Sequence, residues 1–336
     1  MLRFLASSAA LVLAACQTAP SVGSASASVA GAAANPAAAN PAAASPAAAS
    51  PVATNPVATN PVGIAAPEDR QGQRVAVNGT EIFVESSGTG EPLVLLHGYP
   101  LSGALFSRVR DELDDQYRVI TLDHRGYGLS GSANGVRSVD TYAEDALAVL
   151  DRLGIESAHM GGMSMGGPIL FSIMRQRPGA VRSAILIDTN HQSAGAPERG
   201  IWQGARRALE ESGDVGSITP FLLPNMLSGQ TRLVDAPGQA DYLGRVVAQA
   251  SLEGAIGGTY ALENRPDATE LIRNTQMPVL VVVGREDTLY PVSVSQDMAR
   301  LAPRGELAVI PGAAHAAVFE FPEAVAAEIE AFLQRL

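Results

Sequence analysis

The sequence predicts an α/β fold after about residue 70, with a mainly parallel β-sheet covered by helices on both faces. Three observations support this fold class. Short runs rich in Val, Ile and Leu alternate with stretches whose apolar residues recur at helical spacing. A glycine-rich turn with the pattern Gly-x-Ser-x-Gly, centred on Ser164, follows one such run and precedes a helix-like stretch. The alternation returns after residue 268, and strands that alternate with helices form mainly parallel sheets.

Composition divides the 336 residues into two unequal parts. Ala, Pro, Ser, Asn, Thr and Val dominate the first seventy or so residues, whereas the remainder has the mixed composition of a globular protein large enough to bury a core. The formal net charge is -11. This acidity argues against a nucleic-acid partner, because few basic groups are available to neutralise phosphates.

The first sixteen residues have the features of an export signal. Arg3 precedes an apolar run over 4–12 that is too short to span a bilayer as a helix. Leu13-Ala14-Ala15-Cys16 resembles a bacterial lipobox, so we expect residues 1–15 to be a signal peptide and Cys16, the only cysteine, to be lipidated. A plain secretory signal is the alternative. By the sorting rule of such lipoproteins, Gln17 indicates the outer membrane, on its periplasmic or surface face, and hence a location in the cell envelope.

Residues 16–69 are predicted to be a disordered tether. From Asn35 to Pro61, Asn-Pro or Ser-Pro pairs recur every five residues and are separated mainly by Ala, Val and Thr. Proline at this spacing forbids a continuous helix, and no large apolar residues are present to form a core. We therefore expect an extended spacer between the lipid and the folded domain.

The first strands and helices follow in order from residue 70. An Asn78-Gly79 turn between two alternating apolar runs predicts a β-hairpin over 74–85. The further predicted elements of this part are strands at 92–96, 117–123, 158–163 and 181–188, and helices at 139–153 and from the serine turn to about 176.

The turn around Ser164 needs glycine on both sides for a steric reason. A serine that stands clear of a sheet sits on a tight strand-to-helix turn with a strained backbone. Side chains at 162 and 166 would collide in such a turn, which accounts for Gly162 and Gly166. The following helix directs its amino terminus at the serine, so the Met165 amide is available to an oxyanion.

The remaining chain is predicted to be helical first and then to return to the sheet. Helices are expected at 202–211, 219–227 and 242–250, and strands at 277–284 and 306–310. The first of these strands is followed by Asp287 and the second by His315, and an amphipathic helix begins at Pro322.

Three motifs together resemble the α/β-hydrolase superfamily: His97-Gly98-Tyr99-Pro100, the segment 123–130 (Asp-His-Arg-Gly-Tyr-Gly-Leu-Ser), and Gly-Met-Ser-Met-Gly-Gly at 162–167. The stretch from 93 to 130 resembles the non-haem perhydrolase and aryl-esterase branch, and the serine motif is closer to the enol-lactonase branch. The resemblance implies an eight-stranded, mainly parallel sheet flanked by helices. It also implies a core of 70–189 and 268–336, with a helical cap of 190–267 inserted after strand 6.

The resemblance also implies roles for individual residues. Ser164 would be the nucleophile, His315 the base and Asp287 the acid, in the chain order typical of this fold. Asp188 is the second choice for the acid, because some relatives carry it after the sixth strand. The backbone amides of Tyr99 and Met165 would form the oxyanion hole, and His97 is expected to be a structural hydrogen-bonding residue rather than a base.

The cap is expected to line the substrate pocket. The apolar and aromatic candidates are Trp202, Phe221, Leu222, Met226 and Tyr260. Packing within the cap itself is the alternative for each of them.

These residues predict a serine hydrolase of small carboxylic esters or lactones that acts through an acyl-enzyme intermediate. Epoxide hydrolases and haloalkane dehalogenases carry an aspartate at the position of Ser164, which argues against both activities. Two alternatives stay open: a perhydrolase or non-haem haloperoxidase-type activity, and a catalytically idle binding module on the cell envelope. We expect no cofactor and no metal, and a small-molecule ester or lactone as the ligand. The oligomeric state is not predicted.

Overall fold

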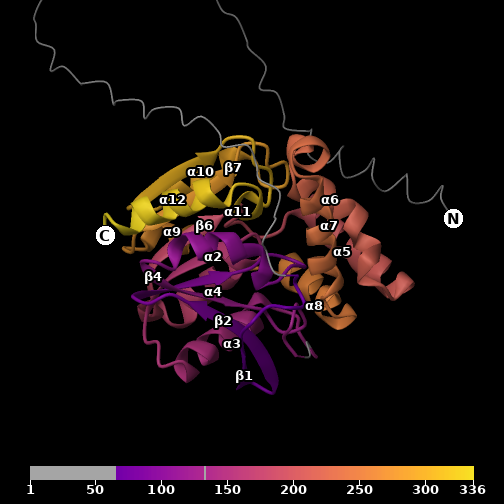
Figure 1. The fold of residues 1–336 in the computed structure, drawn as a ribbon, viewed down its shortest axis with the longest axis horizontal. Coiled ribbons are helices and arrows are strands. Elements are labelled where there is room, and N and C mark those ends of the chain that lie inside the picture. The colour runs from indigo at the N-terminus through magenta and orange to yellow at the C-terminus, as the bar shows by residue number, and fades with distance from the viewer. Residues whose placement is uncertain (1–65, 132–133) are drawn as a thin grey trace, which may run out of the picture. The chain divides into compact units, whose positions relative to one another are not determined.

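The computed structural model describes residues 66–131 and 134–336, which contain one eight-stranded β-sheet (Figure 1). The strands lie in the order β1-β2-β4-β3-β5-β6-β7-β8. All neighbouring pairs are parallel except β1 with β2 and β2 with β4. The strands are β1 Gln73–Val77, β2 Thr80–Ser87, β3 Glu91–Leu96, β4 Tyr117–Leu122, β5 Ala158–Met163, β6 Val181–Ile187, β7 Val279–Gly284 and β8 Gly305–Ile310. The predicted eight-stranded, mainly parallel sheet is confirmed.

Helices connect these strands. The helices are α2 Ser107–Leu113, α3 Val139–Arg152, α4 Gly166–Gln176, α5 Ala196–Ser212, α6 Thr219–Met226, α7 Pro237–Ala248, α8 Leu252–Glu263, α9 Thr269–Asn274, α10 Val292–Leu301, α11 Ala317–Glu320 and α12 Pro322–Leu333. Right-handed crossovers place α2, which leads back from β3 to β4, on one face of the sheet, and α3, α4 and α10 on the other. The packing agrees, because α12 contacts α2 while α3 contacts α4.

The predicted signal peptide, Cys16 and the predicted tether as far as residue 65 lie outside the described residues. Among the residues that are described, no helix combines the length and apolar character that crossing a membrane requires.

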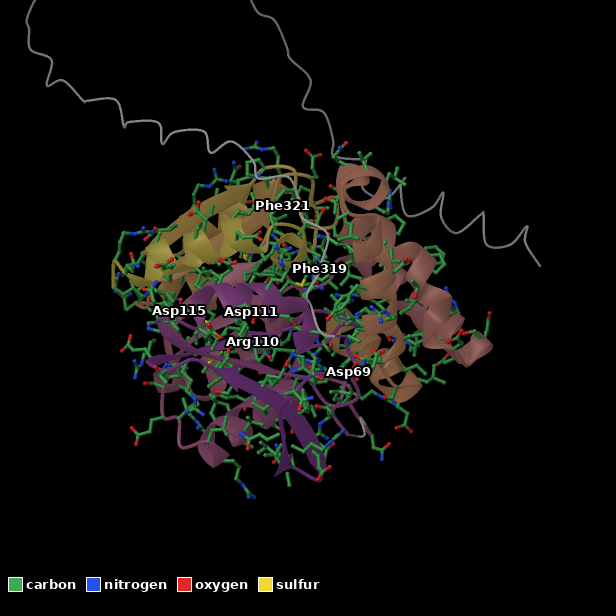
Figure 2. The ribbon with its side chains drawn as sticks, viewed as in Figure 1. Asp69, Arg110, Asp111, Asp115, Phe319 and Phe321 are labelled. Atoms are coloured by element: carbon green, nitrogen blue, oxygen red, sulfur yellow. The ribbon has the colours of Figure 1, made fainter. Side chains whose placement is uncertain are left out.

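The β1–β2 hairpin turns at Asn78-Gly79, as the sequence predicts. Both residues have positive φ, 46° and 76°, which is the backbone of the two-residue turn that suits twisted antiparallel strands. Just before the hairpin, the buried Arg70 side chain forms ion pairs with Glu85, at 2.9 Å, and with Asp123. Arg110 of α2, labelled in Figure 2, adds a second pair to Glu85 at 2.8 Å. The start of the folded part is therefore fixed to β2 and to the end of β4.

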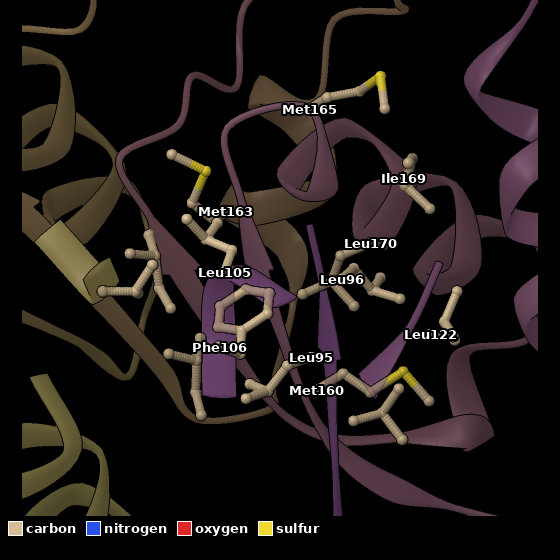
Figure 3. Close-up of a cluster of buried hydrophobic side chains, with 14 of the residues drawn as sticks. Leu95, Leu96, Leu105, Phe106, Leu122, Met160, Met163, Met165, Ile169 and Leu170 are labelled. Atoms are coloured by element: carbon tan, nitrogen blue, oxygen red, sulfur yellow. The ribbon is translucent and has the colours of Figure 1, made fainter. Parts of the chain in front are cut away.

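The core lies directly beneath the serine turn. Every residue of β5 and of β7 is buried, as expected for central parallel strands. Figure 3 shows Met163 and Met165, the two neighbours of Ser164, within the apolar cluster that includes Leu96, Phe106 and Leu170. Close packing on both sides of Ser164 holds the turn in place.

The chain between β6 and β7 contains the helices α5 to α9, of which α5 to α8 lie together beside the sheet (Figure 1). Its two ends meet, because the Ala268 amide donates a hydrogen bond of 2.8 Å to the His191 carbonyl. α5 begins at Ala196, six residues before its predicted start, with Pro197 in the first turn. α8 is not predicted at all, because three glycines interrupt its sequence.

Those glycines fit α8 against the core. A Cβ atom at Gly254 would lie 2.3 Å from the carbonyl oxygen of Gly126, and one at Gly258 would lie 2.1 Å from the Tyr127 hydroxyl. Neither distance is possible for a larger residue, so tertiary packing outweighs the low helix propensity of glycine here.

Candidate active site

Tyr99 and the three residues predicted to form the triad follow strands at the same edge of the sheet. Tyr99 follows β3, Ser164 follows β5, Asp287 follows β7 and His315 follows β8. The carboxyl ends of parallel strands meet at one edge, and ligands of open α/β sheets bind there. Sequence positions far apart in the chain therefore come together in the fold.

Ser164 lies on the sharp turn between β5 and α4 with φ of 52°, a conformation that is costly for a residue other than glycine. Its carbonyl accepts a hydrogen bond of 2.7 Å from the Thr189 hydroxyl, and its amide donates to the carbonyl of Ile187 at 3.0 Å. A Cβ atom at Gly162 would lie 2.3 Å from the carbonyl oxygen of Gly166. Both flanking glycines are therefore required by space, as the sequence pattern indicates.

His315 joins Ser164 to Asp287. Its Nε2 lies 2.9 Å from Ser164 Oγ, and its Nδ1 lies 2.8 Å from Asp287 Oδ2. The other carboxylate oxygen of Asp287 accepts hydrogen bonds from the amides of Leu289, at 2.8 Å, and Tyr290, at 3.0 Å. With the carboxylate held in this way, His315 carries its proton on Nδ1. The unprotonated Nε2 then faces the Ser164 hydroxyl.

His315 and Asp287 are almost fully shielded from solvent, with 1% and 4% of their surfaces exposed, while Ser164 is partly exposed. An ion pair between histidine and aspartate is stronger in such a dry setting than in water. The arrangement can therefore remove a proton from the serine hydroxyl and hold the resulting imidazolium next to a carboxylate.

Asp188 occupies a different place. Its carboxylate accepts hydrogen bonds from the amides of Gly284, at 2.8 Å, and Ala317, at 3.1 Å. Burial and the neighbouring charge of Asp287 raise the pKa of the Asp188 carboxyl well above its usual range. The structure thus brings Asp287, and not Asp188, to the histidine ring, while Asp188 ties the end of β7 to the start of α11.

The loop after β3 lies against the serine. A Cβ atom on Gly98 would approach Ser164 Cβ to 2.9 Å. His97 shapes the loop, because its Nε2 accepts a hydrogen bond of 3.0 Å from the His124 amide while Nδ1 lies 2.8 Å from the Gly98 carbonyl oxygen. Burial lowers the pKa of His97 to about 4, so the ring is neutral at pH 7. Within the described ranges, the Tyr99 and Met165 amides donate to no protein acceptor.

The predicted pocket residues separate into different groups. Trp202 of α5 packs edge-on against the Tyr99 ring, with the ring centroids 5.6 Å apart. Phe221 and Leu222 are partly buried on α6, and Met226 is buried at its end.

Tyr260, the fifth candidate, packs against two arginine side chains. The guanidinium carbons of Arg206 and Arg137 lie 3.8 Å and 4.4 Å from its ring centroid. Its ring therefore makes cation–π contacts with α5 and with the chain just before α3.

Sequence reasoning missed a polar cluster beside the histidine. Tyr290 lies edge-on to the His315 ring, with the centroids 5.6 Å apart, and its hydroxyl donates to Glu198 of α5 at 3.0 Å. Glu198 is also paired with Arg265. The Tyr-Pro pair after Asp287 was the available signal for Tyr290, but nothing in the sequence linked it to residues 198 and 265. In the described part of the chain, no cluster of three or more His, Cys, Asp or Glu residues could hold a metal ion.

Comparison with known proteins gives the same fold. Residues 91–210 match the family model described as alpha/beta hydrolase fold. A thermophilic esterase from Thermogutta terrifontis superposes with a TM-score of 0.74 and 31% identity, over 78% of this chain and 98% of that one. An enol-lactonase from Burkholderia xenovorans LB400 has a TM-score of 0.73 at 20% identity, over 78% of this chain and 100% of that one. A non-heme haloperoxidase from Rhodococcus erythropolis is 29% identical over 283 residues, 77% of this chain and 98% of the relative.

The fold and the serine turn define a protein of the α/β-hydrolase class. The 31% identity to an esterase that is covered almost end to end shows kinship as well as shape. The chain belongs to the α/β-hydrolase superfamily; its relatives include an esterase and a non-heme haloperoxidase, and an enol-lactonase shares its fold.

Proposed function

We propose that the protein is a serine hydrolase that cleaves small carboxylic esters or lactones through an acyl-enzyme intermediate. The observation that carries this proposal is the hydrogen-bonded chain from Ser164 Oγ through His315 to Asp287, with 2.9 Å and 2.8 Å between the bonded atoms. Nucleophile, base and orienting acid stand within reach of one another.

In this mechanism His315 Nε2 takes the hydroxyl proton as Ser164 Oγ attacks the acyl carbonyl carbon. Asp287 stabilises the imidazolium through the bond to Nδ1, and the imidazolium then donates its proton to the departing alkoxide. Water, deprotonated by the same histidine, attacks the acyl-enzyme and restores Ser164. For a lactone the alcohol and acid remain in one product.

The oxyanion formed in each step needs donors. We assign this role to the amides of Tyr99 and Met165, which lie in the loop against Ser164 and at its own turn and donate to no other described protein group. By analogy with a measured donor in another serine hydrolase, each amide contributes about 3 kcal/mol to the transition state.

Active-site labelling tests the proposal. A fluorophosphonate should label the wild type and fail to label Ser164→Ala, and hydrolysis of p-nitrophenyl acetate and butyrate should disappear in the same variant. Ser293→Ala, which changes an exposed serine of α10, is the matched control and should behave like the wild type. A folded wild type that is neither labelled nor active on esters or lactones would support the idle binding module instead.

Perhydrolysis is a second candidate, favoured by the likeness to a non-heme haloperoxidase. Hydrogen peroxide would replace water as the nucleophile, so that the acyl-enzyme yields a peracid and free Ser164. Acetate or an acetate ester with peroxide should then give peracetic acid, detected by its oxidation of bromide. Product formation that is insensitive to Ser164→Ala would rule this route out.

We also propose that Cys16 carries a lipid that attaches the hydrolase to the cell envelope, on the outer membrane. The support is the Leu-Ala-Ala-Cys sequence and the Gln17 that follows it. The full chain expressed in a bacterium should incorporate radiolabelled palmitate, and Cys16→Ala should abolish incorporation. Secretion of unlabelled wild type into the soluble periplasmic fraction would favour the plain secretory signal.

A further inference from the structure

One carboxylate of the cap gathers hydrogen bonds from three separate places. Glu198 Oε1 accepts from the Trp202 indole nitrogen at 3.3 Å, from the Tyr290 hydroxyl at 3.0 Å and from Arg265 Nη1 at 2.5 Å. Oε2 accepts from Arg265 Nη2 at 2.6 Å. The donors come from α5 itself, from the loop that follows Asp287, and from the segment that returns from the cap to the core.

Arg265 holds this carboxylate in a fixed position. Its side chain is 1% exposed, and its Nε donates to the Gln192 carbonyl at 2.8 Å. A bidentate pair with a buried guanidinium fixes both the position and the plane of the Glu198 carboxylate. The Glu198 side chain is 22% exposed, so it lies at the border of the buried region.

The two aromatic donors, Trp202 and Tyr290, contact Tyr99 and His315, which belong to the candidate site. Trp202 packs against Tyr99, whose loop touches the serine, and Tyr290 packs against the His315 ring. Burial raises the pKa of the Tyr290 hydroxyl, which therefore stays protonated and donates to Glu198 throughout the working pH range. One carboxylate thus bonds to two rings, one packed against Tyr99 and the other against His315.

We propose that Glu198 is a positioning residue that holds Trp202 against Tyr99 and Tyr290 against His315, and that the two rings thereby limit the size of the acyl group that the enzyme accepts. This inference rests on the proposed ester hydrolysis. Rings held by hydrogen bonds at their polar ends cannot swing away to admit a longer chain. A pocket with fixed walls discriminates between substrates that differ by a few methylene groups.

The acyl-chain profile of three variants tests the proposal. Tyr290→Phe removes one hydroxyl and changes no charge, and Glu198→Gln weakens all the bonds at once. Glu263→Gln is the matched control: it alters another cap carboxylate, paired with Arg206 at 2.8 Å, that bonds neither aromatic ring of the cluster. The measured quantity is the ratio of kcat/KM for p-nitrophenyl octanoate to that for p-nitrophenyl acetate.

We expect Tyr290→Phe and Glu198→Gln to raise this ratio by roughly 10-fold, within the range that hydrophobic pockets achieve. Glu263→Gln should leave the ratio unchanged. A role in folding alone would lower kcat/KM for both esters equally and would not move the ratio. A ratio within twofold of the wild type in a folded, active Tyr290→Phe enzyme refutes the inference while the proposed function stands.

Trp202 supplies an independent readout, since it is the only tryptophan in the chain. Its emission spectrum and its quenching by acrylamide report on this one side chain without any turnover. Both should change in Tyr290→Phe and Glu198→Gln but not in Glu263→Gln, and unchanged spectra would overturn the positioning role. A wild type that is not labelled by the fluorophosphonate and hydrolyses neither esters nor lactones refutes the proposed function, and the acyl-size limit falls with it.

Discussion

Replacing Asp287 with asparagine should strongly reduce activity, because the proton of the neutral His315 ring would move from Nδ1 to Nε2. Asp287 Oδ1 accepts from two backbone amides, those of Leu289 and Tyr290. In Asp287→Asn the side-chain oxygen stays with these amides, because an NH2 group there would face two donors. The NH2 must then point at His315 Nδ1, which can only accept. The proton of the neutral ring moves to Nε2, where it faces Ser164 and prevents proton removal.

The expected loss follows from this tautomer change. The same substitution in a protease with a Ser-His-Asp triad lowers kcat about 10⁴-fold, which corresponds to about 5.5 kcal/mol of transition-state stabilisation. We expect a loss of the same order here, because both the 2.8 Å bond to Nδ1 and the pair of amides on the other oxygen are present. The KM should change little, since Asp287 is buried behind the histidine.

Steady-state hydrolysis of p-nitrophenyl acetate by Asp287→Asn and Asp188→Asn checks the reasoning, with thermal unfolding to show that both variants fold. Asp188→Asn disturbs one of two backbone hydrogen bonds and should cost far less than Asp287→Asn. Asp287→Asn activity within tenfold of the wild type, or an equal loss in Asp188→Asn, would show that the acid is wrongly assigned.

Three further predictions concern Gly166, Ser164 and His97. Gly166→Ala places a Cβ atom 2.1 Å from the Leu96 carbonyl oxygen and should lower the free energy of unfolding in urea by about 1–3 kcal/mol; unchanged stability would contradict this. Ser164→Gly should be about 1 kcal/mol more stable than Ser164→Ala, because only glycine is relaxed at a φ of 52°, and an equal midpoint for the pair would refute the strain. His97 has a folded pKa of about 4 against 6.5 in the unfolded chain, so acidification from pH 6.5 to 4 protonates only the unfolded state. Wild-type stability should lose about 3 kcal/mol from this group across that window, and His97→Gln should show a correspondingly flatter pH profile.

The sheet was predictable because its signals are local. Short apolar runs rich in valine, such as 279–284, favour buried strands over helices, and the Asn78-Gly79 pair favours a hairpin by its backbone preference. The positions of Ser164, Asp287 and His315 could be inferred because each lies in the loop or turn that follows a predicted strand. Strand ends converge in a parallel sheet, so order in the chain already implies proximity.

The cap could not be predicted to the same degree because its signals are tertiary. α8 forms against local propensity, since Gly254 and Gly258 allow its backbone to reach Gly126 and Tyr127. The bond between Glu198 and Tyr290 joins residues 92 positions apart, and no local pattern marks either as a partner of the other. Nothing in the sequence therefore indicated that arginines cover the Tyr260 ring or that Tyr290 packs against His315.

The hydrogen bond between Ala268 and His191 joins the two ends of the segment that lies between β6 and β7. Because the segment leaves and rejoins the core at one place, its length does not affect the spacing of the strands. Segments of quite different length and sequence can therefore occupy 192–267 without altering the pairing of β6 with β7. Under the proposed function, substrate preference can therefore diverge by exchange of this segment while the residues at the strand ends, and the chemistry proposed for them, stay the same.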